Sequence, residues 1–139
     1  MPSLLIVDDE PLIRRVCRFA LQMVNLQCEE AENGVHALEV IRRQRFDAAL
    51  LDIDMPELNG TELSAQIREN PDNHHMNLIM MSGRSAPDDL ARMLSAGADD
   101  YIAKPLSVVQ LQARVINALR LRDAQLRSDM LASRLLGVN

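Results

Sequence analysis

Short apolar runs alternate along the chain with longer segments in which apolar residues recur every three or four positions. The short runs are Leu4–Val7, Leu26–Ala31, Ala48–Leu51, Leu78–Met81 and Tyr101–Ala103. Short continuous apolar runs are typical of buried β-strands, and the second run is the weakest example. The spaced pattern predicts helices between the strands. In the first helix it is formed by Leu12, Ile13, Val16, Phe19, Ala20 and Val24.

Residues that favour helix starts and turns stand between these runs. Pro11 suits the first turn of a helix, and Asn33 can cap the next one. Asn59-Gly60 indicates a loop before a third helix. Ser107 followed by Gln110 is similar to a capping box at the start of the last helix. The sequence thus predicts five strands that alternate with five helices.

This alternation predicts an α/β domain with a doubly wound, five-stranded parallel sheet that helices cover on both faces. In such a sheet the carboxyl ends of the strands share one edge, and ligands bind there. The residues that follow the predicted strands at this edge are Asp8 and Asp9, Asp52, Ser82, and Lys104. We therefore expect side chains that are far apart in the sequence to meet at one edge.

These residue types together suit one kind of chemistry. Carboxylates that lie close together repel each other, so a cation must offset their charge. Mg²⁺ takes oxygen ligands and keeps positions open for water or phosphate. Lys104 adds a fixed positive charge, and Ser82 adds a hydroxyl donor. A carboxylate beside these groups is suited to attack a phosphoryl group in line and to become an acyl phosphate.

Composition narrows the classes of function. The 139 residues make about one domain, and 47% of them are hydrophobic, which is enough for an ordinary core. The net charge of −5 and the 2% of aromatic residues argue against direct binding of nucleic acid or of an anionic membrane. Cys17 and Cys28 form no CxxC motif, and the segment MPSLLIVDDE lacks the basic start of a signal peptide. We expect reduced thiols and a cytoplasmic protein.

Three segments resemble the motifs of bacterial two-component response-regulator receiver domains. They are LIVDDE at 5–10, LDIDMPELNG at 51–60 and GADDYIAKP at 97–105, with Ser82 between the last two. The resemblance covers residues 4 to about 118. It implies a flavodoxin-like fold and a phosphorylation-dependent signalling switch. It also implies that the chain is no turnover enzyme and shows at most slow self-dephosphorylation.

The resemblance assigns a role to each residue that matches a motif. Asp52 would accept the phosphoryl group from a histidine kinase or a phosphotransfer protein, as in a phosphorelay. Mg²⁺ or Mn²⁺ would assist this transfer. The metal ligands that the resemblance implies are Asp8, Asp9, Asp52 and the backbone carbonyl of Asp54.

Further residues would respond to the phosphoryl group. In the family, residues at the positions of Ser82 and Lys104 contact the phosphoryl oxygens, and those at Ser82 and Tyr101 form the conformational switch. We add one hypothesis about this chain. Arg84 and Asp54 pair across the mouth of the site and restrict attack by water, which would modulate the lifetime of the phosphorylated form.

Two other functions stay open at this point. Asp52-x-Asp54 after an apolar strand also resembles the first motif of haloacid-dehalogenase-type phosphatases, in which one acid is a nucleophile and the other an acid/base. Those enzymes place the motif on their first strand, whereas two predicted strands precede Asp52 here. The second alternative is a degenerate receiver that acts only as a protein-interaction module. The complete set of acidic, hydroxyl and lysine residues argues against it.

Two adjacent histidines lie in a polar stretch of the chain. His74 and His75 follow the segment NPDN at 70–73. Histidine is a common metal ligand, but the neighbouring sequence offers no third ligand. We therefore expect a surface loop here rather than a metal site.

Helical character continues beyond the residues that the resemblance covers. We expect a receiver domain at 1–118 and a C-terminal helical extension or linker at 119–139, so that the last helix is extended. One heptad register is formed by Leu121, Ala124, Ser128, Leu131, Leu135 and Val138. It is short and irregular for a coiled coil. The extension would pack on its own domain, form a homodimer, or lead to an output domain or partner protein.

Overall fold

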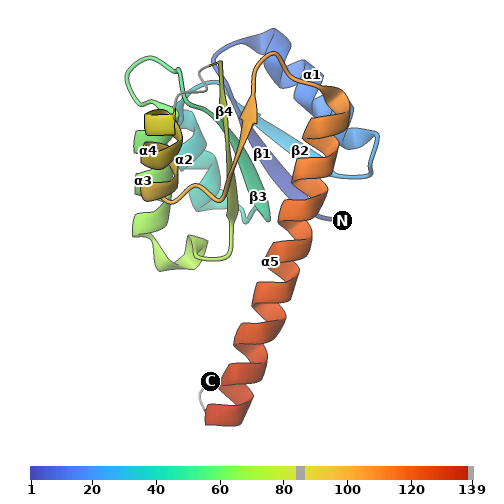
Figure 1. Ribbon diagram of the computed structural model, residues 1–139, viewed down its shortest axis with the longest axis vertical. Coiled ribbons are helices and arrows are strands. Elements are labelled where there is room, and N and C mark those ends of the chain that lie inside the picture. The colour runs from blue at the N-terminus through green and yellow to red at the C-terminus, as the bar shows by residue number, and fades with distance from the viewer. Residues whose placement is uncertain (84–86, 138–139) are drawn as a thin grey trace.

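The chain folds around one parallel β-sheet. The computed structural model describes residues 1–83 and 87–137. Within these residues, five strands lie in the order β2-β1-β3-β4-β5, which is the order of a doubly wound, flavodoxin-like sheet (Figure 1). Their bounds are β1 Ser3–Val7, β2 Gln27–Ala31, β3 Ala48–Asp52, β4 Asn77–Ser82 and β5 Asp100–Ala103. The predicted fold class is confirmed, and each strand begins and ends within about one residue of its predicted bounds.

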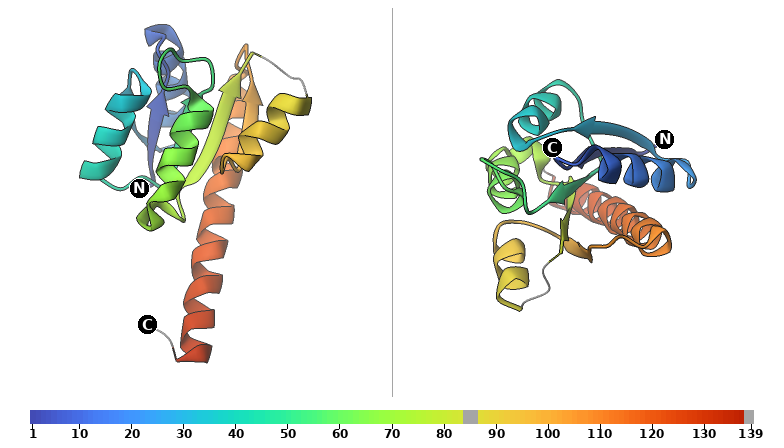
Figure 2. Two further views of the ribbon diagram at one scale, coloured as in Figure 1. Left: turned by 90° about the vertical axis from the view of Figure 1, so that its left-hand side faces the viewer. Right: turned by 90° about the horizontal axis from the view of Figure 1, so that it is seen from above.

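Helices cover both faces of the sheet. The described helices are α1 Pro11–Gln22, α2 Gly34–Arg43, α3 Gly60–Glu69, α4 Pro87–Ser95 and α5 Val108–Leu136, with a short 3₁₀ helix η1 at Pro71–Asn73. α1 and α5 pack on one face, and α2, α3 and α4 pack on the other (Figure 2). Strand residues alternate between the two layers, as Leu4 and Leu5 illustrate: the first faces α1 and α5, and the second faces α2 to α4.

The first helix buries only part of the apolar face that its spacing predicts. Leu12 and Phe19 are 69% and 68% exposed, whereas Cys17 and Leu21 are fully buried. α1 carries apolar residues on two sides, so the spacing alone does not determine which side contacts the sheet. The buried side is the one that packs against α5 and the neighbouring strands.

Asn33 and Ser107 cap their helices as predicted, and Asn59, which the sequence indicates only as part of a loop, caps a third helix. Asn33 Oδ1 accepts a hydrogen bond from the N–H of His36 at 2.8 Å, at the start of α2. Asn59 forms a reciprocal capping box at the start of α3. Ser107 Oγ accepts a hydrogen bond from the N–H of Gln110 at 3.3 Å, at the start of α5. These contacts satisfy N–H groups that have no partner within the first helical turn.

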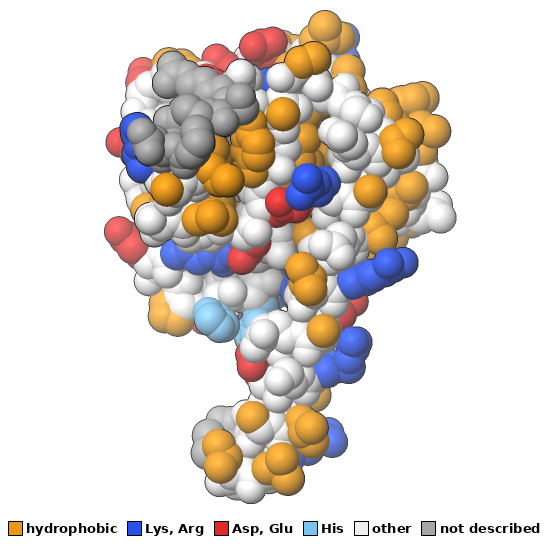
Figure 3. Space-filling model, in the orientation of Figure 1, with side chains coloured by type: hydrophobic (Ala, Val, Ile, Leu, Met, Phe, Trp, Pro, Cys, Tyr) orange, Lys and Arg blue, Asp and Glu red, His pale blue; other side chains and the backbone are white. Residues whose placement is uncertain are grey.

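The last helix extends beyond the body of the domain, as predicted (Figure 1). Its first half packs on the sheet through Leu111, Val115 and Ala118. Where the second half leaves the domain, the guanidinium of Arg122 pairs with Asp47 at 3.1 Å. Figure 3 shows apolar side chains on the surface of this second half. Among the helices described, none combines the length and apolar character that a membrane span requires.

Candidate functional site

The carboxyl edge of the sheet collects the polar residues that the sequence places at its strand ends. Asp8 directly follows β1, Asp52 ends β3, Ser82 ends β4 and Lys104 directly follows β5. Parallel pairing places β1 beside β3, β3 beside β4, and β4 beside β5. The edge is therefore built from four segments that are far apart in the sequence.

Lys104 joins two buried carboxylates at this edge. Its Nζ lies 3.0 Å from Asp8 Oδ2 and 3.2 Å from Asp52 Oδ1. The side chains of Asp8 and Asp52 are 0% and 2% exposed, and that of Lys104 is 18% exposed. Since buried carboxylates are costly without a compensating charge, the ammonium of Lys104 allows the two acids to share the edge.

Asp52 is a carboxyl group with a perturbed pKa. Burial raises the pKa of Asp52 to about 6. The N–H of Asp54, which donates to Asp52 Oδ1 at 3.1 Å, lowers this pKa, as does Lys104, while the negative charge of Asp8 raises it. A protonated carboxyl group is a poor nucleophile, so a further cation at this edge would favour the reactive form of Asp52.

Lys104 keeps its charge in this setting. Partial burial by itself lowers the pKa of an ammonium group. Hydrogen bonds and negative charge from Asp8 and Asp52 outweigh this effect and raise the pKa of Lys104. Lys104 is also the only lysine in the sequence. The site therefore holds a fixed cation that can contact oxygens added to Asp52.

A cluster of carboxylate oxygens continues from Asp8 toward solvent. Oxygen atoms of Asp8, Asp9 and Glu10 lie within 4.8 Å of one another. The N–H of Glu10 donates to Asp8 Oδ1 at 2.9 Å, which orders this turn. Asp8 is buried, and Asp9 and Glu10 are exposed. The all-oxygen donor set fits a hard divalent cation such as Mg²⁺. Glu10 joins the acids that the sequence analysis had singled out.

Ser82 and Tyr101 lie on the two strands beyond Asp52. Ser82 is fully buried, and its carbonyl accepts a hydrogen bond from the N–H of Lys104 at 2.8 Å. Asp52 pairs across the ladder with Met81, the residue before Ser82. Tyr101 is half-buried and packs against the core beneath α2 to α4. Ser82 thus ends the strand next to that of Asp52, while Tyr101 lies on the neighbouring strand β5.

Asp54 lies at the exposed side of the site. Its N–H donates a hydrogen bond to Asp52 Oδ1, and its side chain is exposed. Arg84, the partner that the sequence analysis assigns to Asp54, lies outside the residues that the structure describes. Pairing between Arg84 and Asp54 therefore stays a hypothesis.

Gly60 packs against the backbone of the strand that carries Asp52. A Cβ atom on Gly60 would lie 2.5 Å from the carbonyl oxygen of Asp52 and 2.8 Å from Cα of Ile53. The N–H of Gly60 donates to the carbonyl of Ile53 at 3.3 Å. The loop after β3 thus folds back so closely that only glycine fits. In the sequence, Asn59-Gly60 indicates only a loop before a helix.

Known proteins share this sequence pattern. The family model for the response regulator receiver domain matches residues 4–116. Response regulator MprA of Mycobacterium leprae is 37% identical over 117 residues, which are 84% of this chain and 50% of that protein. Response regulator MprA of Mycobacterium bovis (strain BCG / Pasteur 1173P2) is 34% identical over 131 residues, with 94% and 56% covered. The chain spans about half the length of these curated relatives.

Solved structures share the fold. A response regulator receiver domain protein (CheY-like) from Methanospirillum hungatei superposes with a TM-score of 0.84 at 29% identity, covering 90% of this chain and 98% of that one. A putative two-component system response regulator/ggdef domain protein has a TM-score of 0.82 at 28% identity, covering 88% and 50%. Together with the match to the family model over most of its length, these similarities show that the chain belongs to the response regulator receiver domain family.

Proposed function

We propose that Asp52 accepts a phosphoryl group from a histidine kinase or a phosphotransfer protein. The family acts in phosphorylation-dependent signalling rather than in turnover of small substrates, and membership brings that role to this chain. The observation that carries the assignment to Asp52 is the contact of one ammonium, Lys104 Nζ, with both Asp8 and Asp52. This contact holds the buried carboxylate of Asp52, at the end of β3, beside a fixed positive charge.

The two oxygens of Asp52 are suited to different tasks. In the described part of the chain, Lys104 Nζ and the N–H of Asp54 both contact Oδ1. Oδ2 then attacks the phosphorus of a phosphohistidine on the partner protein. The Oδ2–P bond forms as the P–N bond breaks, and the histidine nitrogen leaves with the electron pair. Lys104 stays in reach of the phosphoryl oxygens and stabilises their charge.

We infer that the acids beside Asp52 hold Mg²⁺ or Mn²⁺. Support comes from the clustered oxygens of Asp8, Asp9 and Glu10, to which Asp52 and the carbonyl of Asp54 would add. When bound, the ion supplies positive charge next to the transferring group. The same charge would lower the pKa of Asp52 from its raised value of about 6, so that the nucleophile would be ionised in mildly acidic solution as well.

The response to phosphorylation is assigned to Ser82 and Tyr101. In this proposal the Ser82 hydroxyl donates to a phosphoryl oxygen, and the position of Ser82 at the end of the strand next to β3 supports this role. Movement at Ser82 opens or closes space for the Tyr101 ring on β5, which pairs with β4. Phosphorylation changes the populations of the two conformations only if the phosphoryl group contacts them differently. A partner protein would then bind the surface around β5 and α5.

The chain is proposed to comprise a receiver domain at 1–118 and a helical extension at 119–139. The extension forms a homodimer or connects to an output domain or partner protein. Its large apolar side chains are mostly exposed: Leu121, Met130, Leu131, Leu135 and Leu136. Of the predicted heptad register, Val138 lies outside the residues that the structure describes.

Intact-mass measurement tests the phosphoryl acceptor. The chain is incubated with Mg²⁺ and a small phosphodonor such as acetyl phosphate. We expect the mass to increase by one phosphoryl group in the wild type and in Asp72→Asn, an exposed acid at the opposite edge of the sheet. Asp52→Asn should show no increase. A mass increase in Asp52→Asn equal to that of the wild type would refute the assignment.

The same incubation separates the proposed function from the two alternatives. Sustained release of phosphate from unrelated phosphomonoesters would support a haloacid-dehalogenase-type phosphatase. Absence of any mass increase, with small phosphodonors and with a phosphorylated histidine kinase alike, would support an interaction module. A stable or slowly decaying mass increase, without turnover of monoesters, is the result expected for a receiver.

A further inference from the structure

We propose that His74, His75 and Asp129 bind a divalent transition-metal ion such as Zn²⁺ and thereby attach the α5 extension to the body of the domain. The sequence offered no third ligand near the two histidines. The fold supplies one, because α5 brings Asp129 to the loop before β4. The site lies at the amino edge of the sheet, away from the carboxylates around Asp52.

The geometry places three ligand atoms together. His75 Nε2 lies 2.6 Å from Asp129 Oδ2. One ligand atom from each of His74, His75 and Asp129 lies within 4.8 Å of the others, and the two imidazole rings stand 4.9 Å apart at 73°. Ligand atoms around a tetrahedral Zn²⁺ are roughly 3.3 Å apart. Small rotations of partly exposed side chains bring the three atoms to that spacing.

The donor types distinguish this site from the acidic cluster. Two imidazoles and one carboxylate suit Zn²⁺ and similar ions, whereas Mg²⁺ prefers oxygen ligands only. The acidic cluster of Asp8, Asp9 and Glu10 offers oxygens only. The two buried thiols are weak competitors, because burial raises the pKa of Cys17 to about 12 and also raises the pKa of Cys28. Mg²⁺ would therefore bind at the carboxyl edge of the sheet, and Zn²⁺ at the amino edge.

Neighbouring groups hold Asp129 and His74 in position. Gln125 Nε2 donates to Asp129 Oδ1 at 2.8 Å, which leaves Oδ2 directed at His75. The N–H of His74 donates to the carbonyl of Pro71 at 3.1 Å and orders the loop.

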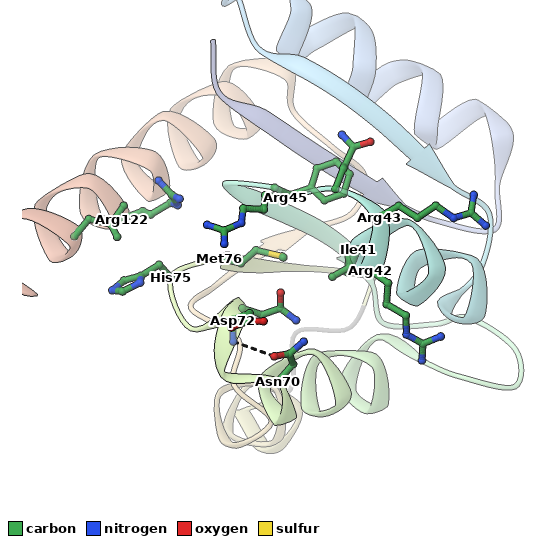
Figure 4. Close-up of a pocket in the computed structure, with 13 residues that line it drawn as sticks. Ile41, Arg42, Arg43, Arg45, Asn70, Asp72, His75, Met76 and Arg122 are labelled. Carbon is green, nitrogen blue, oxygen red and sulfur yellow. Dashed lines mark hydrogen bonds between the residues drawn. The ribbon is translucent and has the colours of Figure 1, made fainter. Parts of the chain in front are cut away.

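Solvent and a fourth ligand can reach the site. The side chains of His75 and Asp129 are 30% and 42% exposed. Figure 3 shows histidine side chains on the surface where α5 leaves the body. His75 and Arg122 line a hollow between the end of α2, η1 and α5 (Figure 4). Its volume is about 450 Å³. Water can therefore complete the coordination of an ion with three protein ligands.

Metal binding would determine how the extension sits on the domain. Without metal, the described contacts at this junction include the Arg122–Asp47 pair at 3.1 Å and the His75–Asp129 pair. A metal ion would add a link between the loop before β4 and the part of α5 that carries Asp129. The direction of the extension, and of anything attached to it, then depends on metal occupancy.

Titration calorimetry on the untagged full chain tests the site. Zn²⁺ is added in buffer that contains excess Mg²⁺, so that the acidic cluster is occupied. We expect one Zn²⁺ per chain, and a loss of affinity of at least about tenfold in His75→Gln and in Asp129→Asn. His36→Gln is the matched control, because His36 lies on α2 and its Nδ1 faces the N–H of Glu32. Circular dichroism confirms that each variant folds.

Two further measurements identify the ligands and the geometry. Co²⁺ in place of Zn²⁺ should give visible absorption that both variants lose, and Zn²⁺ should slow proteolysis within 125–136. Equal Zn²⁺ affinity in the wild type, His75→Gln and Asp129→Asn would overturn the proposal. So would binding that excess Mg²⁺ abolishes, since the ion would then sit in the acidic cluster. Binding that occurs only together with dimerisation, as seen by light scattering, would also overturn it.

Discussion

The ammonium of Lys104 lies 3.2 Å from Oδ1 of Asp52, although the two residues are 52 positions apart in the sequence. The same nitrogen lies 3.0 Å from Oδ2 of Asp8. One cation thus compensates two carboxylates whose side chains are almost fully buried. Both the stability of the fold and the reactivity of Asp52 depend on that contact, and each of the two can be measured separately.

Removal of the lysine should destabilise the fold. In Lys104→Met the two buried carboxylates lose their counter-charge, and we expect the free energy of unfolding in metal-free buffer to fall by about 3 kcal/mol. Urea unfolding at neutral pH measures this. Asp52→Asn should stabilise Lys104→Met by more than it stabilises the wild type, because in Lys104→Met no cation compensates the charge of Asp52. Strictly additive effects of the two substitutions would contradict the coupling.

The raised pKa of Asp52 predicts a pH-dependent stability. Burial raises this pKa from 3.8 to about 6, so the folded chain holds a proton between these values that the unfolded chain has lost. The free energy of unfolding therefore falls as the pH rises from about 4 to about 6, and the penalty is complete above that range.

Asp52→Asn should remove this penalty. We expect the variant to gain stability over the wild type, on the order of 1 kcal/mol at pH 7.5 in the presence of a chelator, and little at pH 4. Urea unfolding at the two pH values measures the difference. Asp72→Asn, at an exposed position, serves as the control and should show no such difference. A gain of the same size at pH 4 and pH 7.5 would show that charge is not its cause.

Gly60 should tolerate no side chain. A Cβ atom there would meet the carbonyl oxygen of Asp52 at 2.5 Å, so Gly60→Ala must displace the end of β3 or the start of α3. We expect a loss of roughly 1–3 kcal/mol of stability and slower phosphorylation at Asp52. Gly83→Ala is the matched control for stability, because a Cβ at Gly83 meets nothing within 4 Å. Equal melting temperatures for the two variants would contradict the close approach.

The sequence predicted most of the site because parallel topology converts sequence order into position. Once Leu4–Val7, Ala48–Leu51 and Leu78–Met81 are recognised as buried strands, the residues after them must meet at one edge. Asp8, Asp52 and Lys104 meet there for this reason. The starts of two helices were also predictable, because they depend on local contacts. Asn33 and Ser107 cap their helices through side chains that bind an N–H three residues further on.

Other features depend on packing that the sequence pattern does not contain. α1 is apolar on two sides, and only contact with α5 determines that Cys17 is buried and Phe19 exposed. Asp129 reaches His75 across 54 residues because α5 continues straight past the domain. The need for glycine at position 60 arises from a contact with Asp52, so it is visible only when both backbones are in place.

The exposed apolar residues of the α5 extension predict concentration-dependent association. We expect the average mass of the full chain to rise with concentration in light scattering, in the presence of a chelator that excludes metal-mediated contacts. A variant that lacks residues 120–139 should stay monomeric. Leu131→Glu, which changes one exposed leucine, should weaken association as well. A full chain that stays monomeric at all concentrations would leave connection to an output domain or partner as the role of the extension.

The position of the phosphoryl group on the chain distinguishes Asp52 from the neighbouring acids as the phosphoryl acceptor. The chain is phosphorylated with a small phosphodonor and Mg²⁺, reduced with borohydride, which converts an aspartyl phosphate to homoserine, and sequenced by tandem mass spectrometry. We predict homoserine at position 52 and unchanged aspartate at positions 8, 9 and 54. Modification at one of those three positions, with Asp52 intact, would show that Asp52 is not the phosphoryl acceptor.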